Sequence, residues 1–169
     1  VGAGGLGDRA QVGRRLGELG LHLLELGRVG RTLAPEHAAH QALAAARMGA
    51  RVALVGSAGS DAYAPQILNT IRRQGVITSG VSQSDLPTGC AFILRESGGR
   101  NRIIVATGAN IEAKADQVPD EILRPECMIL TQTELPAEEV FSLIRRAHAR
   151  GLKVILNLAP AMPLPEDIL

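Results

Sequence analysis

The sequence predicts an α/β sandwich built on a mostly parallel sheet. Short runs of Val, Ile and Leu alternate with amphipathic helical patterns, and glycine ends most of these helices. The order is helix, strand, helix and later strand, helix, strand, which favours parallel pairing through right-handed crossovers. Between the two groups, two alternating segments flank a Gly-Gly turn and indicate a β-hairpin. We therefore expect a main α/β unit and a hairpin that stands off its sheet.

The bulk composition sets the broad class of the protein. A chain of 169 residues has the size of one domain, and its 46% apolar but only 2% aromatic residues indicate an aliphatic core. The net charge is +1, without the clustered basic excess that nucleic acids or anionic membranes attract. No apolar run is long enough to span a membrane. These features predict a cytoplasmic protein with neither nucleic acid nor membrane as partner.

The first 35 residues differ in character from the rest. Residues 1–34 hold nine of the chain's 19 glycines, which disfavour a regular helix. A weak stripe of leucines indicates at most a short helix near 14–26. We expect residues 1–35 to form an atypical Gly/Arg-rich segment without a strand. The α/β domain is then expected over 36–169, with its hairpin at about 86–107.

From residue 36 the elements can be read in order. The patterns predict a helix over 36–49, a strand over 51–59, a helix over 61–75, loop and turn over 77–89, hairpin strands over 90–108, a short helical stretch over 112–123, a strand over 127–136, a helix over 137–151 and a strand over 153–161. Glycine at 49, 75 and 151 ends the three helices. Pro65 fits the first turn of the second helix, where a backbone N–H is not needed.

Cysteine and histidine give no strong chemical signal. Cys90 and Cys127 are isolated within apolar runs, so we expect both thiols to be buried and reduced. His37 and His40 stand three apart on a predicted helix and could face one metal ion. No third ligand stands near them, so no metal site is predicted. His22 and His148 are expected at the surface.

Polar residues gather where three predicted strands end. These ends are Gly56–Asp61, Gln132–Glu134 and Asn157, and ligands bind beyond the carboxyl ends of parallel strands. Each also has a structural alternative: Asp61 is suited to cap the next helix, Glu134 to complete a strand end and Asn157 to pair with turn backbone. The loop "GSAGSD" lacks the Gly-Lys-Ser/Thr of a phosphate-binding loop.

The stretch "HQALAAARMGARVALVGSAGSDAYAPQILNTIRRQGV" resembles the ribokinase, or phosphofructokinase-B, family of carbohydrate kinases. The similarity continues through "PTGCAFIL", "GGRNRIIVATGAN", "ILTQTELPAEEV" and "KVILNLAPAMPLPEDIL", over roughly 38–169. It is greatest to members that phosphorylate ribose. The resemblance implies transfer of the γ-phosphoryl of ATP to a primary sugar hydroxyl, with ATP, Mg and a monovalent cation as cofactors. It also implies an incomplete αβα sandwich with part of a small β lid.

The resemblance assigns roles to single positions. Glu134 matches an acid that hydrogen-bonds the sugar, as a carboxylate can with two vicinal hydroxyls. Cys90 and Ala91 follow the lid entry, where the lid touches sugar, and His40 stands at a sugar-binding Asn position. The remaining matches are lid or structural positions: Thr88 and Gly89 in the lid entry, Asn110 in the "GAN" after the lid, and Asn157 in the last strand.

The sequence departs from the family at its start. Positions 35–40 read "PEHAAH" where the family has "GGKGAN", and the first strand with its "NxD" has no counterpart. The resemblance places the catalytic Asp, the nucleotide pocket and the cation loop after Leu169. No catalytic residue is therefore assigned within the chain, and we expect the chain alone to be inactive.

Other readings of these departures stay open. One is an inactive truncated product whose first 35 residues come from a shifted reading frame. Another is a non-catalytic module that binds sugar or forms a homodimer through the lid. Within the family, another sugar or a nucleoside is the alternative substrate.

Overall fold

The computed structural model describes residues 29–33, 36–95 and 99–169. Contacts divide the chain into two compact units. In the described residues, the first unit consists of β1, β4 and β5, and the second holds the helices and the remaining strands. Each unit is considered by itself.

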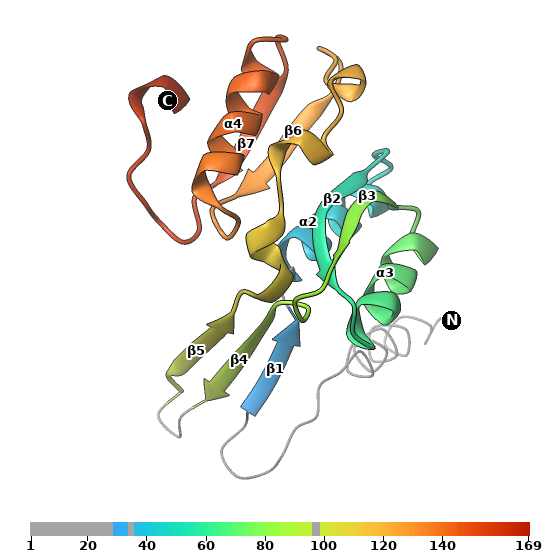
Figure 1. Ribbon diagram of the computed structural model, residues 1–169, viewed down its shortest axis with the longest axis vertical. Helices are drawn as coiled ribbons and strands as arrows, with labels where there is room; N and C mark the ends of the chain where they lie inside the picture. Colours follow the sequence, from blue (N-terminus) through green and yellow to red (C-terminus); the bar gives the residue numbers. More distant parts are fainter. Residues whose placement is uncertain (1–28, 34–35, 96–98) are drawn as a thin grey trace, which may run out of the picture. The chain divides into compact units, whose positions relative to one another are not determined.

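The first unit is a three-stranded antiparallel sheet of order β1-β4-β5, seen in Figure 1. Its strands are β1 (Val29–Leu33), β4 (Cys90–Arg95) and β5 (Asn101–Ala106). The β4–β5 pair confirms the predicted hairpin. The expectation of no strand before residue 36 is wrong for β1, whose backbone pairs with β4 from Val29 opposite Leu94 to Leu33 opposite Cys90. Sequence reasoning missed it because pairing to a distant strand stabilises a short segment that has no clear alternation of its own.

The second unit begins with a helix–strand–helix–strand group. It comprises α2 (Glu36–Arg47), β2 (Ala53–Gly59), α3 (Tyr63–Arg73) and β3 (Ile77–Ser84). β2 and β3 pair in parallel, as the crossover through α3 requires. The core between these elements is formed by small and aliphatic side chains, namely Ala39, Ala42, Leu54, Ile71 and Val76.

β3 corrects the prediction of loop and turn over 77–89. Its sequence, "ITSGVSQS", is polar and contains glycine, which usually argues against a strand. Pairing to β2 overrides this preference: the Ser82 hydroxyl lies 2.8 Å from that of Ser57 across the pair. Gly80 allows close approach, because a Cβ there would lie 2.8 Å from Val55 Cγ2.

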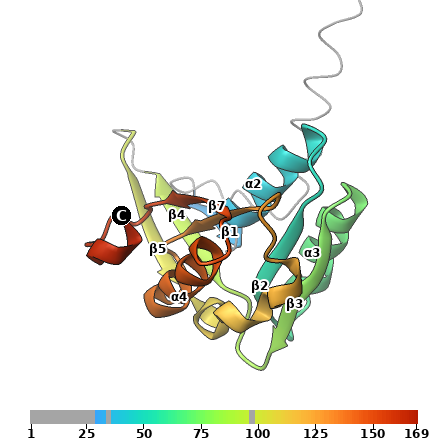
Figure 2. The same ribbon diagram turned by 90° about the horizontal axis from the view of Figure 1, so that it is seen from above.

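The rest of the second unit is a strand–helix–strand group preceded by short 3₁₀ turns. The turns are η1 (Gly108–Glu112), η2 (Ala115–Gln117) and η3 (Asp120–Ile122), followed by β6 (Met128–Gln132), α4 (Ala137–His148), β7 (Lys153–Asn157) and a last turn, η4 (Glu166–Ile168). β6 and β7 pair in parallel, and α4 lies against them (Figure 2). The predicted helical stretch over 112–123 therefore exists as 3₁₀ turns.

The cysteines behave differently from each other. Cys90 is buried in β4 and free, as expected, whereas Cys127 is exposed and free, which corrects the prediction of two buried thiols. Cys127 lies in the turn before β6, where its N–H donates to the carbonyl of Arg124. Cys127 therefore begins an apolar run and yet lies at the surface, not in the core.

Some predictions concern residues outside the described ranges, and others stay untested. The possible helix near 14–26 and His22 lie outside the described residues. The assignment of residues 1–35 as a separate segment stays a prediction. Of the helices that the structure describes, none is long and apolar enough to cross a membrane. Cytoplasmic location stays a prediction.

Candidate functional site

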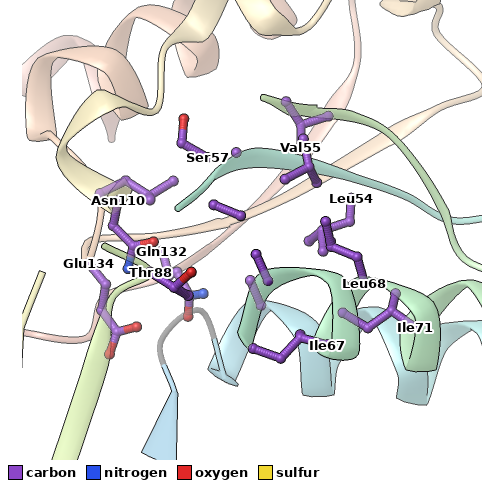
Figure 3. A pocket seen from close by; sticks show the side chains of 16 residues that line it. Leu54, Val55, Ser57, Ile67, Leu68, Ile71, Thr88, Asn110, Gln132 and Glu134 are labelled. Carbon is purple, nitrogen blue, oxygen red and sulfur yellow. The ribbon is translucent and has the colours of Figure 1, made fainter. Parts of the chain in front are cut away.

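A pocket in the second unit has one polar and one apolar end (Figure 3). Leu54, Ile67, Leu68 and Ile71, from β2 and α3, line the apolar end. The polar end gathers four side chains, which are Thr88, Asn110, Gln132 and Glu134. The cavity volume is about 40 Å³. Ligand pockets usually measure about 300–1,000 Å³, so this unit supplies a polar corner rather than an enclosing site.

The parallel strands explain why polar groups meet here. Gln132 is the last residue of β6, and Glu134 follows two residues later in the turn that leads to α4. Asn110 lies in η1, which packs against β2, and its residue is 6% exposed. Strand ends leave backbone groups that side chains or ligands must satisfy. The arrangement therefore follows the general rule that sites form at the carboxyl ends of parallel strands.

Asp61 fixes Thr88 at the edge of this pocket. The Thr88 N–H donates to Asp61 Oδ2 at 2.7 Å, and the Thr88 hydroxyl donates to Asp61 Oδ1 at 2.9 Å. The same Oδ1 accepts from the N–H groups of Tyr63 and Ala64 at 3.0 and 3.2 Å, which caps the start of α3. Asp61 thus satisfies the first N–H groups of α3, as a cap does, from one residue before the N-cap position, Ala62. One carboxylate joins the start of the helix to the segment that leads into β4.

The electrostatics of Asp61 follow from these contacts. Burial by itself raises the pKa of the Asp61 carboxyl, but the hydrogen bonds from Thr88, Ala64 and Tyr63 outweigh it and hold that pKa below its ordinary value. Asp61 is therefore ionised near neutral pH. Since the Thr88 hydroxyl gives its proton to Asp61 and accepts from the Gly59 N–H at 3.1 Å, it has no proton left for a ligand.

Two glycines let the backbone segments around Thr88 lie close together. A Cβ on Gly59 would lie 2.5 Å from the Leu86 carbonyl oxygen and would overlap the Thr88 nitrogen. Gly108 has φ of +49°, and a Cβ there would overlap the Pro87 carbonyl oxygen. Both positions exclude a side chain. The Ala109 N–H donates to Pro87 at 2.9 Å and completes the junction.

Comparison with known proteins identifies the class to which this architecture belongs. The model of the pfkB family carbohydrate kinases matches residues 37–168. The chain belongs to the pfkB family. It is 38% identical to the ribokinase of Bacillus subtilis over 133 residues, which is 76% of this chain and 45% of the relative. The pfkB-family chain thus spans less than half the length of the curated relatives it matches.

Solved structures agree with this assignment. The ribokinase of Thermotoga maritima superposes with a TM-score of 0.66 at 32% identity, covering 77% of this chain and 42% of that one. The ribokinase of Arabidopsis thaliana, solved in complex with ribose and ATP, gives a TM-score of 0.61 at 30% identity over 70% and 40% of the two chains. The predicted αβα sandwich of the ribokinase type is confirmed as the fold class.

The structure brings several of the predicted site residues together in the pfkB-family chain. Thr88, Asn110 and Glu134 line the same pocket although they stand far apart in the sequence. Asn157 pairs with Gln132 across the β6–β7 ladder, and its carbonyl accepts from Ala159 at 2.8 Å. Gly89 lies close to Gly108, since a Cβ built on Gly108 would lie 2.8 Å from the Gly89 nitrogen. The roles proposed for these residues stay predictions.

Other predicted site residues are not among those that line this pocket. Cys90 and Ala91 belong to β4 in the first unit, where they pair with Ala106 and Val105 of β5. His40 is exposed on α2, and Ala38 is the residue of that helix that lines the pocket. The side chain of His37 lies outside the described part of the chain. His148 is exposed at the end of α4, as expected.

Sequence reasoning gave no separate role to one pocket residue of the pfkB-family chain, Gln132. The residue is 5% exposed and lines the pocket two residues before Glu134. The pattern did mark Gln132–Glu134 as a polar strand end. It could not distinguish a buried amide facing a pocket from one that pairs with neighbouring backbone.

Proposed function

We propose that this chain provides part of the sugar-binding side of a ribokinase-type, ATP-dependent sugar kinase. The reaction would transfer the γ-phosphoryl group of ATP to the primary hydroxyl of ribose. The observation that carries the proposal is the polar corner of the pocket, where Asn110, Gln132 and Glu134 meet at the carboxyl end of β6. The family and the ribokinase relatives support it.

The polar corner is chemically suited to a neutral polyol. A carboxylate such as Glu134 accepts hydrogen bonds and can bind two hydroxyl groups at once. Amide side chains such as Asn110 and Gln132 both donate and accept, which suits the mixed pattern of a sugar. Aliphatic side chains beyond the corner exclude water from one flank. The combination favours a small molecule that carries several hydroxyls.

The described residues do not fit an ATP–Mg site. Asp61 is already committed to Thr88 and to the start of α3. Within the described ranges, no group of three His, Cys, Asp or Glu side chains is placed to hold a metal ion. The nucleotide, Mg and monovalent cation of the family therefore remain proposals for the whole kinase.

Isothermal titration with D-ribose tests the proposal. We expect measurable heat for the wild-type chain and about ten-fold weaker binding for Glu134→Gln, because loss of a charge-assisted hydrogen bond costs about 1.5–3 kcal/mol. Glu121→Gln, on the exposed turn η3, is the matched control and should bind as the wild type does. Fructose and adenosine test the alternative substrates. No heat with any of them would sink the proposal.

Two further expectations belong to the same proposal. The chain alone should not phosphorylate ribose, so ADP release in a coupled assay should equal the background; turnover above it would contradict this expectation. The homodimer stays a prediction, supported by Ile103, Ile104 and Val105 of β5, which are each 57–60% exposed. Sedimentation velocity at several concentrations would decide it, and a single monomeric species throughout would exclude it.

A further inference from the structure

Gln132 carries a buried oxygen that no described residue satisfies. Among the described residues, Gln132 Oε1 is the one buried side-chain N or O atom without a hydrogen-bond partner. The residue is 5% exposed and lines the pocket. A buried acceptor left unpaired costs about 1–3 kcal/mol. Buried polar groups in proteins are nearly always paired, so an exception at a pocket points to a ligand.

The polar neighbours of Gln132 are committed to other partners. The Thr88 hydroxyl donates its proton to Asp61, and the Thr133 hydroxyl donates to the Pro160 carbonyl at 2.6 Å. Asn157 stands opposite Gln132 in the parallel ladder, yet it does not supply a donor to Oε1. None of these three neighbours donates to Oε1, and the pocket that Gln132 lines is the other side from which a donor can approach.

We propose that Gln132 contacts the substrate directly, with its Oε1 accepting a hydrogen bond from a hydroxyl group of the sugar bound in this pocket. The inference rests on the proposed function, because it assigns a further contact to the same site. Figure 3 shows Gln132 beside Thr88, Asn110 and Glu134 at the polar end of the pocket. Glu134 adds a second acceptor two residues away, so a ligand in this corner must supply hydrogen-bond donors.

The requirement for donors also sets the substrate class. Sugar hydroxyls donate protons, whereas phosphate and carboxylate groups are acceptors at neutral pH. A ligand that placed a phosphate at this corner would face the carboxylate of Glu134 and leave Oε1 unpaired. The corner therefore favours a sugar hydroxyl over a phosphate or carboxylate group at this position. An ordered water is the other chemical source of a donor, and binding of deoxy sugars distinguishes it from a sugar hydroxyl.

Binding to deoxy sugars tests the contact. D-Ribose and its analogues that lack the hydroxyl at carbon 1, 2 or 3 are titrated into the wild type, Gln132→Met and Gln74→Met. Methionine matches glutamine in length but cannot accept a strong hydrogen bond. Gln74 is exposed at the end of α3 and serves as the control.

We expect the same loss of affinity from removing one sugar hydroxyl as from replacing Gln132. For the wild type, removing one particular hydroxyl should weaken binding about ten-fold, the effect of one buried hydrogen bond. Gln132→Met should bind ribose about ten-fold more weakly and should no longer distinguish that analogue from ribose. Gln74→Met should behave as the wild type does.

A second measurement on the wild type protects the test against a variant that fails to fold. The side-chain carbonyl carbon of Gln132 is followed by NMR through its amide group. Its chemical shift should move with ribose and stay in place with the one weak analogue.

Two results would overturn the inference. If Gln132→Met keeps the full discrimination between analogues, or if the carbonyl shift responds equally to all sugars, then a water satisfies Oε1. These results would leave the proposed function intact. If the wild type binds no pentose at all, both proposals fail together.

Discussion

The structural role of Asp61 exceeds that of a helix cap. The local pattern predicted that Asp61 caps α3, because an acid near the start of a helix is a common start signal. It could not predict the pair of hydrogen bonds with Thr88, which lies 27 positions away. Asp61 therefore holds the approach to β4 against the start of α3. This link places Thr88 at the rim of the pocket.

Replacing Asp61 tests that link. Asp61→Asn keeps one acceptor oxygen but loses the charge and cannot accept from all four donors. We expect the free energy of unfolding to fall by about 1–3 kcal/mol, measured by urea denaturation. Asp85→Asn, at an exposed position in the loop that follows β3, is the matched control. It should change stability by less than about 0.5 kcal/mol. Equal effects of the two substitutions would contradict the account.

The pH dependence of stability has a defined sign. The folded pKa of Asp61 lies below its ordinary value of 3.8. Its stabilising contribution is therefore complete above that value and is lost as the pH falls through the folded pKa. Between pH 5 and 2, the wild type should lose more stability than Asp61→Asn. Urea titrations at several pH values measure this difference, and parallel curves would refute the assignment.

At the scale of elements, local signals predicted the helices well. α2, α3 and α4 were each expected from amphipathic spacing and a terminal glycine, and each forms within a few residues of its expected bounds. β1 and β3 were missed because their own sequences are polar or glycine-containing. Partners elsewhere in the chain stabilise them: β4 pairs with β1, and β2 pairs with β3.

Arg146 shows how the 3₁₀ turns are attached to α4. Its guanidinium donates to the carbonyls of Ala115 and Val118 at 2.6 and 2.8 Å and also contacts Asp120. From helical periodicity alone, Arg146 is predicted only to be a charged residue on a half-exposed helix face. The structure uses it to tie η2 and η3 to the helix, because its planar group offers several donors in fixed directions.

Substitution of Arg146 by lysine tests this attachment. Lysine keeps the charge but cannot reach three acceptors in that geometry. We expect Arg146→Lys to lower the free energy of unfolding by about 1–2 kcal/mol and to speed amide exchange in the segment of Ala115 and Val118. Arg73→Lys, on the exposed end of α3, is the control. Stability equal to that of the control would argue against the attachment.

At the scale of the whole molecule, the family pattern predicted more than local patterns did. It matched Glu134 to a sugar-binding acid and Thr88 and Asn110 to lid or structural positions, and the structure places all three around one pocket. It could not indicate the unsatisfied oxygen of Gln132, because pairing of a side chain is a property of the folded arrangement. Nor could it indicate that so small a cavity remains within this unit. These features depend on packing between distant segments.

We propose that ribose binds at the polar corner of the second unit. A titration of the ¹⁵N-labelled chain with D-ribose, followed by amide NMR, tests this proposal. We predict that the largest shifts occur at Thr88, Asn110, Gln132 and Glu134, while residues around the distant Arg145–Asp167 ion pair stay unchanged. Absence of any shift, or shifts centred away from these four residues, would contradict the account.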